Sequence, residues 1–281
     1  MSKIPSLQDL LEAGVHFGHK VSRGNPRMSP FIYGAREGVH IIDLTISEKY
    51  LKEACQFATE LGKTGQTLLF VGTKKQAHDL TEETAKKIDA PYLSERWVGG
   101  FLTNFDEISK NIKRLNELKE AKEKGTLKKY TKKEQLLLDR RAADLEKVLG
   151  GVANLTKVPE AIFVLDANKD SGAVKEASRI GVKVIAVTDT NSDPTLVDYP
   201  IPGNDDAIKS IKIMLETIAE AYSEGKAQGV KSEELRVKKE EAAAVKAKEK
   251  EELPEEVIEE VAAAEEKVEK ETLEESERKV T

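Results

Sequence analysis

The sequence lacks three features that would point outside the cytosol. Its 281 residues include one cysteine, Cys55, which excludes an intramolecular disulfide and favours a reducing compartment. No apolar run approaches the roughly 20 residues that cross a bilayer. The N-terminal stretch MSKIPSLQDLLEAG has no apolar core of the kind a secretory signal needs. We therefore expect a soluble, cytoplasmic protein without a membrane partner.

Aromatic residues are scarce, at 5%, whereas charged residues make up 34% and give a formal net charge of −6. This charge is unevenly distributed. Residues 231–281 hold 18 Glu against 11 Lys and Arg, a balance of −7, which leaves +1 for residues 1–230. The acidic average therefore does not exclude a nucleic-acid partner.

The C-terminal segment, residues 231–281, consists mainly of Glu, Lys, Ala and Val and has no aromatic residue. Such a composition cannot bury a core of its own. We predict an acidic tail that is disordered or loosely helical.

Apolar runs of strand length alternate with helical patterns through the rest of the chain. Strands are predicted at 39–44, 67–72, 161–167 and 182–189, with a weaker one at 91–98. Helical patterns follow them, and the last one begins near residue 205. Continuous apolar strands that alternate with helices predict a parallel sheet with helices on both faces. We expect a three-layer α/β/α, flavodoxin-like domain formed by residues 1–103 and 159–230.

Residues 104–158 interrupt this alternation. They contain two polar helical patterns, each with a narrow apolar stripe, separated by a break at Gly125 and Thr126. Glycine pairs at 99–100 and 150–151 flank the region, which holds 14 basic and 9 acidic residues, a balance of +5. We predict an inserted antiparallel α-helical hairpin, a coiled-coil arm with a basic surface.

A doubly wound sheet invites a nucleotide-enzyme interpretation, but the required loops are missing. No strand is followed by G-x-G-x-x-G or by a Walker loop. The turn after the second strand reads GTKKQA, so Thr73, Lys74 and Lys75 could bind a small phosphorylated ligand at a helix N-terminus. A plain strand–helix turn with solvated lysines explains them equally well. A phosphoacceptor domain is disfavoured because no acidic pair follows the first strand.

Two histidines, His16 and His19, lie in the glycine-rich stretch GVHFGHKVSRGNP. They lack the i, i+4 spacing and the glutamate of a zinc helix. Folding could still bring them to loop carboxylates and form a Zn²⁺ or Mg²⁺ site; the candidates are Asp189, Asp193, Asp205 and Asp206. Helix caps and Asx turns are the commoner role of such loop residues, and Asp205 is expected to be a cap. We predict no cofactor and no catalysis.

Lys and Arg recur beside Gly, Asn and aromatic residues in HKVSRGNPRMSPFIYGAR, ERWVGGFLTNF, NIKRL, LKKYTKK and DRRAAD. Cations on exposed loops neutralise phosphates, and aromatic rings can stack on unpaired bases. The aromatic candidates are Phe17, Phe31, Tyr33, Trp97 and Phe101. Packing in the core is the alternative, and we favour it for Phe31, Trp97 and Phe101. A scaffold that binds only proteins is a further alternative.

Several of these stretches together resemble one family, the bacterial small-subunit ribosomal protein two. They are AGVHFGHK, NPRMSPFIYGAREGVHIIDL, LLFVGTKKQA, RWVGGFLTNF, TKKEQLLLDRRAADLEKVLGG, DTNSDP and IPGNDDAI, in the family's order over about residues 4–228. The resemblance implies a non-catalytic constituent of the small ribosomal subunit. It also implies binding to small-subunit rRNA at the head–body junction, on the solvent side near the mRNA exit. Neighbouring ribosomal proteins, including ribosomal protein one, are the implied protein partners.

The resemblance and the basic motifs together give sixteen candidate RNA-binding residues: Lys20, Arg23, Arg27, Arg36, Lys74, Lys75, Arg96, Trp97, Asn104, Lys110, Lys113, Arg114, Lys132, Lys133, Arg140 and Arg141. Family members often have an aromatic residue before the Asn-Pro dipeptide. This chain has Arg23 and Gly24 there, which argues against base stacking at that point.

Overall fold

The structure is a computed structural model that describes the backbone of residues 4–251 and, except for Lys128, the side chains of residues 4–230. The chain divides into two compact units, residues 1–229 and 230–281. The first unit holds both sheets of the part of the chain that the structure describes. The helix α7 (Ile208–Glu251) continues into the predicted tail, and residues 252–281 lie outside the described residues.

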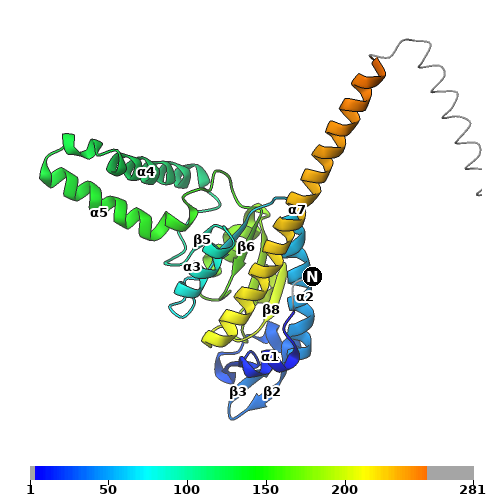
Figure 1. Cartoon of the computed structure of the whole chain (residues 1–281). Coiled ribbons are helices and arrows are strands. Elements are labelled where there is room, and N and C mark those ends of the chain that lie inside the picture. The colour runs from blue at the N-terminus through cyan, green and yellow to red at the C-terminus, as the bar shows by residue number, and fades with distance from the viewer. Residues whose placement is uncertain (1–3, 252–281) are drawn as a thin grey trace, which may run out of the picture. The chain divides into compact units, whose positions relative to one another are not determined.

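A parallel sheet forms the centre of the first unit (Figure 1). Its strands are β4 (Leu68–Val71), β5 (Tyr92–Leu93), β6 (Ala161–Val164), β7 (Lys183–Thr188) and β8 (Tyr199–Pro202). Their order is β5-β4-β6-β7-β8, and every neighbouring pair is parallel. This order is that of a flavodoxin-like, doubly wound sheet. The predicted parallel α/β sheet is confirmed.

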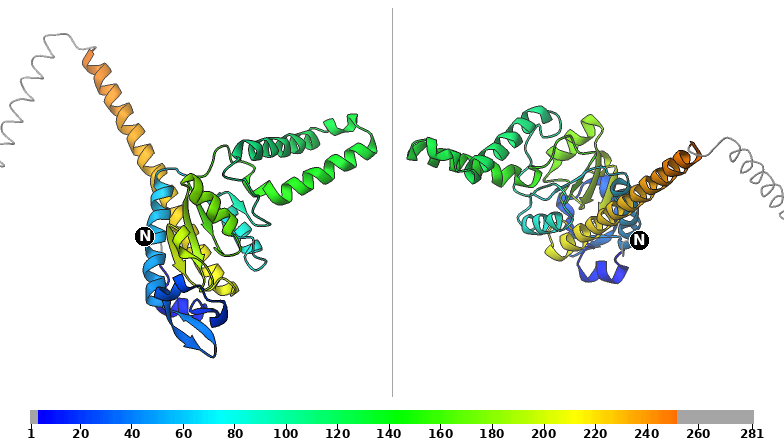
Figure 2. Two further views of the ribbon diagram at one scale, coloured as in Figure 1. Left: turned by 180° about the vertical axis from the view of Figure 1, so that it is seen from behind. Right: turned by 45° about the horizontal axis from the view of Figure 1, so that its top comes forward.

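The two faces of the sheet bury alternate residues of the same strands. Leu68, Phe70 and Phe163 pack on one face with α2 (Leu44–Lys63), α3 (His78–Lys87) and α7. Leu69 and Val71 pack on the opposite face with α6 (Ser171–Ile180) and the residues around α4 (Phe105–Glu123). Because successive side chains of a strand point to opposite faces, continuous apolar runs supply both layers. Figure 2 shows the helices on both sides of the sheet.

Glycines set the distance between α2 and α7. A Cβ atom on Gly225 would overlap the carbonyl oxygen of Thr59, and one on Gly62 would overlap the carbonyl oxygen of Tyr222. Gly229 approaches the carbonyl of Lys63 in the same way. The two helices therefore cross backbone against backbone, which only glycine permits at these positions.

The first predicted strand belongs to a different sheet. Val39–Ile42 forms β3, which pairs antiparallel with β1 (Phe17–Lys20) and β2 (Ile32–Arg36) in the order β1-β3-β2. The strands β2 and β3 are joined by Glu37 and Gly38, both with positive φ, as a two-residue hairpin of type I′ requires. The prediction that residues 39–44 begin the parallel sheet was wrong, because the tight turn at Glu37 and Gly38 makes this strand pair antiparallel with β2.

The fifth parallel strand is β8, which the sequence did not predict. Its residues read YPIP, and Pro200 and Pro202 lack backbone donors. β8 pairs only with β7, at the edge of the sheet, where missing donors on the outer side cost no ladder hydrogen bonds. The short helices α1 (Leu7–Glu12), η1 (Val21–Arg23) and η2 (Pro26–Phe31) were also not predicted. In α1 a capping box between Ser6 and Asp9 satisfies the first turn.

Residues between β5 and β6 form α4, η3 (Thr126–Lys129), α5 (Lys132–Leu149) and η4 (Gly150–Val152). Gly125 is left-handed and ends α4, and a capping box between Thr131 and Glu134 begins α5. Ion pairs join the two long helices, with Lys119 Nζ 2.5 Å from Glu146 Oε2 and Lys122 Nζ 3.0 Å from Asp139 Oδ1. Figures 1 and 2 show α4 and α5 side by side, leading away from the sheet. In the part of the chain that the structure describes, no helix is both long and apolar enough to span a bilayer.

Candidate functional site

Charged side chains meet at the carboxyl edge of the parallel sheet. Lys74 follows β4, Asp166 follows β6, and Asp205 and Asp206 follow β8. The Lys74 ammonium lies 3.2 Å from Asp166 Oδ2, 2.8 Å from Asp205 Oδ1 and 2.7 Å from Asp206 Oδ1. Burial alone would lower the pKa of Lys74, and the hydrogen bonds to Asp205 and Asp206 outweigh it and raise that pKa. We call these four residues, with His19 and Asp189, the edge cluster.

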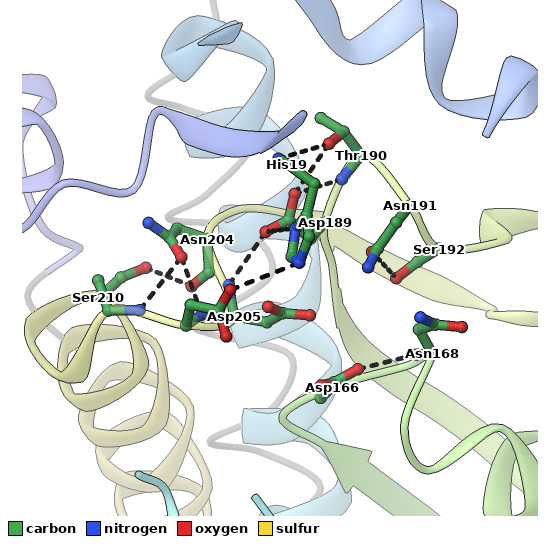
Figure 3. A network of polar contacts seen from close by, with 12 residues as sticks. His19, Asp166, Asn168, Asp189, Thr190, Asn191, Ser192, Asn204, Asp205 and Ser210 are labelled. Carbon is green, nitrogen blue, oxygen red and sulfur yellow. Dashed lines mark hydrogen bonds and ion pairs between the residues drawn. The ribbon is translucent and has the colours of Figure 1, made fainter. Parts of the chain in front are cut away.

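His19 joins β1 to the edge cluster. Its Nδ1 lies 3.0 Å from Asp189 Oδ2, its Nε2 lies 3.4 Å from Asp206 Oδ2, and its backbone N–H donates to Thr190 Oγ1 at 2.9 Å. The hydrogen bond to Asp189 raises the pKa of His19. Figure 3 shows the imidazole beside Asp189 and Thr190, next to Asp205. A Cβ on Gly18 would lie 2.6 Å from the Thr190 Cγ2 methyl, so the absence of a side chain at Gly18 lets β1 approach the loop that follows β7.

The loop after β8 is held by Asn204 rather than by Asp205. The amide oxygen of Asn204 accepts from the backbone N–H groups of Asp206 at 2.8 Å and Ala207 at 3.1 Å, just before α7. Asp205 turns to Lys74 and is 1% exposed. The expectation that Asp205 caps the helix was wrong, because its carboxylate pairs with the Lys74 ammonium and Asn204 accepts from the backbone N–H groups before α7.

This arrangement favours cations over phosphates. Four carboxylates face one ammonium and one imidazole, and Asp205 Oδ2 has no hydrogen-bond partner within the described residues. Burial and the charges of Asp166 and Asp189 raise the pKa of Asp205. Ligand atoms of His19, Asp205 and Asp206 lie within 4.8 Å of one another, a set that can coordinate a divalent cation. The same carboxylates pair with Lys74 and argue against it as a phosphate ligand. The neighbouring Lys75 is exposed and stays a candidate.

The loop between β5 and α4 is organised by one carboxylate of α6. Glu176 accepts hydrogen bonds from Trp97 Nε1 at 3.2 Å and from the backbone N–H groups of Gly100 at 2.7 Å and Leu102 at 3.2 Å. The Trp97 ring packs against Phe101, with centroids 5.3 Å apart, and Phe101 is fully buried. Sequence reasoning did not single out Glu176, because a helix-surface glutamate carries no motif. Arg96 and Asn104 of the same loop are exposed.

The other aromatic candidates divide between packing and exposure. Phe31 packs edge to face on Tyr50, with centroids 5.4 Å apart. Phe17 and Tyr33 are 50% and 80% exposed. The basic candidates of the first segment, Lys20, Arg23, Arg27 and Arg36, are exposed, and Arg27 pairs with Asp193.

The α4–α5 pair brings several candidates together. Lys110, Lys113 and Arg114 of α4 line one groove with Lys129 and Tyr130, two residues that sequence reasoning did not single out although LKKYTKK was recognised as basic. A second groove at the base of the pair is lined by Arg96, Asn111 and Arg141. In all, fourteen of the sixteen candidates are exposed within the described residues, all except Lys74 and Trp97.

Comparison with known proteins shows the family to which the chain belongs. Residues 10–225 match the family described as ribosomal protein S2. The chain belongs to the ribosomal protein S2 family. It is 46% identical over 254 residues to the small ribosomal subunit protein uS2 of a Nitratiruptor species, covering 90% of this chain and 94% of the relative. The uS2 protein of Helicobacter hepaticus is 45% identical over 252 residues, covering 90% and 95%, and that of Desulfatibacillum aliphaticivorans is 47% identical over 221 residues, covering 79% and 75%.

Membership of the ribosomal protein S2 family confirms the resemblance read from the motifs. The family is a structural, non-enzymatic component of the ribosome, so the prediction that the chain is not an enzyme is confirmed. The alternative of an enzyme or sensor for a small phosphorylated ligand loses its support at Lys74 for the reason given above. The roles of the individual basic residues stay predictions.

Proposed function

We propose that this chain is a structural constituent of the small ribosomal subunit that binds small-subunit rRNA through its exposed basic residues. The observation that carries the proposal is the exposure of fourteen candidate side chains on a member of the ribosomal protein S2 family. Thirteen of these residues lie in three groups: the segment from β1 to β2, the loop before α4, and the α4–α5 pair; the fourteenth, Lys75, lies between β4 and α3. Their cations contact phosphates and release counterions, while Asn104 and backbone N–H groups position the RNA.

The proposal includes a finer location and a partner. We place the chain at the junction of head and body, on the solvent side near the mRNA exit, in cytoplasmic ribosomes. There it supports assembly and translation and docks ribosomal protein one. The family resemblance supports these statements, and the charge balance of +5 over residues 104–158 supports the α4–α5 pair as an arm that reaches into RNA.

Sedimentation of a cell lysate tests the proposal. The chain is expected to co-migrate with small subunits at low salt and to dissociate progressively as salt rises, because phosphate contacts weaken with ionic strength. Free migration at low salt would overturn it. An association with subunits that survives RNase treatment would favour a scaffold that binds only proteins.

Charge variants locate the RNA-binding surface. Replacing Lys110, Lys113 and Arg114 by Gln should flatten the dependence of log K on log salt by about 0.7–0.9 for each phosphate that is no longer neutralised. The matched control replaces the exposed lysines of α2, Lys49, Lys52 and Lys63, by Gln, with the same change in net charge. If both variants weaken rRNA binding equally, the attraction is general electrostatics and is not specific to the α4–α5 pair.

A further inference from the structure

We propose that the groove between α4 and residues 126–130 binds an unpaired segment of RNA, with Tyr130 stacking on one of its bases. The inference rests on the proposed function and names the nucleic-acid conformation that this part of the surface recognises. It concerns a residue that neither the motifs nor the family comparison assigned.

The groove is lined by both cationic and apolar side chains. It has a volume of about 660 Å³. Its charged lining residues are four cations and one carboxylate, Glu117, and its apolar lining includes Leu118 and Leu138; the cations are Lys110, Lys113, Arg114 and Lys129. Lys110 is partly neutralised, since its Nζ lies 2.6 Å from Glu107 Oε1. No ion pair within the described residues engages Lys113, Arg114 or Lys129, so their charges stay available to phosphate oxygens.

Tyr130 combines an exposed ring with a fixed backbone. The residue is 52% exposed. Its N–H donates to the carbonyl of Leu127 at 3.1 Å, and its own carbonyl accepts from Gln135 Nε2 at 2.8 Å. The next residue, Thr131, begins α5 with a capping box. Because the backbone is held from both sides, the ring is presented at the groove without a large ordering cost on binding.

The chemistry favours an unpaired nucleotide over a duplex. In an A-form helix the base faces are stacked on one another, so a protein ring can reach them only in loops, bulges and ends. Cations track the phosphate backbone while an aromatic ring stacks on a base of any identity, the combination found in single-strand binding surfaces. The excess of cations over carboxylates at the groove disfavours a basic partner. An acidic protein segment would satisfy the charges but would leave the exposed ring without a stacking partner.

The test uses the full chain and small-subunit rRNA from the same source. Tyr130→Ala is expected to weaken binding roughly 5-fold or more, the lower end of the loss measured when a stacked ring is removed. Tyr130→Phe should bind like the unsubstituted chain, because the ring is kept. Tyr130→Leu, apolar but without a π-face, should bind like Tyr130→Ala. Ultraviolet crosslinking should join Tyr130 to a nucleotide that chemical probing finds unpaired.

The outcomes separate the inference from the function on which it rests. If the unsubstituted chain does not bind rRNA, the proposed function and the inference both fail. If it binds and Tyr130→Ala binds equally well, or Tyr130→Leu restores full affinity, the stacking role alone is overturned. A crosslink to a base-paired nucleotide, or one to protein that survives RNase, also overturns it. Thermal melting followed by circular dichroism checks that the variants fold, and the Tyr130→Phe protein controls for the substitution itself.

Discussion

The carboxylate of Glu176 accepts a hydrogen bond from the indole N–H of Trp97 at 3.2 Å and thereby ties α6 to the loop that leads into α4. Two further backbone donors, from Gly100 and Leu102, converge on the same side chain. A single glutamate therefore satisfies three donors of one loop, and the exposed Arg96 and Asn104 depend on that loop for their positions.

Replacement of Glu176 should loosen this loop. Glu176→Ala leaves three donors without a partner, and we expect it to lower the free energy of unfolding by about 1–3 kcal/mol. Glu176→Gln keeps one acceptor oxygen and should have an intermediate effect. Trp97 is the single tryptophan of the chain, so its fluorescence reports the loop directly. An emission spectrum unchanged in Glu176→Ala would show that the loop does not need the carboxylate.

The close crossing of α2 and α7 should make the protein sensitive to an added methyl group at Gly225. Gly225→Ala places a Cβ against the carbonyl of Thr59 and forces the helices apart. Overpacking of this kind costs about 1–3 kcal/mol, which denaturant unfolding can measure. Gly34→Ala is the control, because its Cβ would meet nothing within 4 Å and its φ is not left-handed. Equal stability of the two variants would contradict the crossing geometry.

Sequence patterns predicted the parallel sheet because its strands are buried on both faces and read as apolar runs. Leu68–Val71 and Ala161–Val164 are fully buried, as such runs require. β8 escaped prediction because Pro200 and Pro202 are untypical of strands and are tolerated only at an edge. Val39–Ile42 was placed in the wrong sheet, because an apolar run reveals a strand but not its partner.

The candidate site was less predictable than the fold. His19, Lys74 and Asp205 are separated by 55 and 131 residues along the chain, and no local pattern states that they meet. The predicted strands 161–167 and 182–189 carry Asp166 and Asp189 near their ends, and parallel strands bring such ends to one edge of the sheet. The pairing of Lys74 with these carboxylates, and hence its unsuitability for phosphate, required the tertiary structure.

Removal of the Lys74 ammonium should lower the free energy of unfolding, because the carboxylates of the edge cluster lose their cation. Lys74→Met leaves Asp166 and Asp205 buried without their cation, and breaking a buried pair in this way costs about 3–5 kcal/mol. Lys75→Met, at the exposed neighbouring position, should change the stability by less than about 0.5 kcal/mol. Chemical denaturation of both variants at neutral pH measures the difference. Equal free energies of unfolding for Lys74→Met and Lys75→Met would show that the ion pairs of Lys74 do not stabilise the edge cluster.

The two histidines of the glycine-rich stretch should respond to pH in opposite directions. The hydrogen bond to Asp189 raises the pKa of His19 in the folded protein, so its contribution to stability is complete below about pH 6.5 and is lost as pH rises through the folded pKa. Burial lowers the pKa of His16, so its contribution is lost as pH falls below about 6.5.

Single substitutions separate these two effects. His19→Gln should flatten the decline of unfolding free energy on the alkaline side, and His16→Gln should flatten it on the acidic side, as measured by urea unfolding across the histidine titration range. The double variant His16→Ala with His19→Ala should impair folding or subunit incorporation. It removes the contact between the His19 imidazole and the Asp189 carboxylate, which connects β1 to the parallel sheet. Normal assembly of the double variant, together with an unaltered pH profile in His19→Gln, would show that the imidazole of His19 does not hold β1 against the sheet.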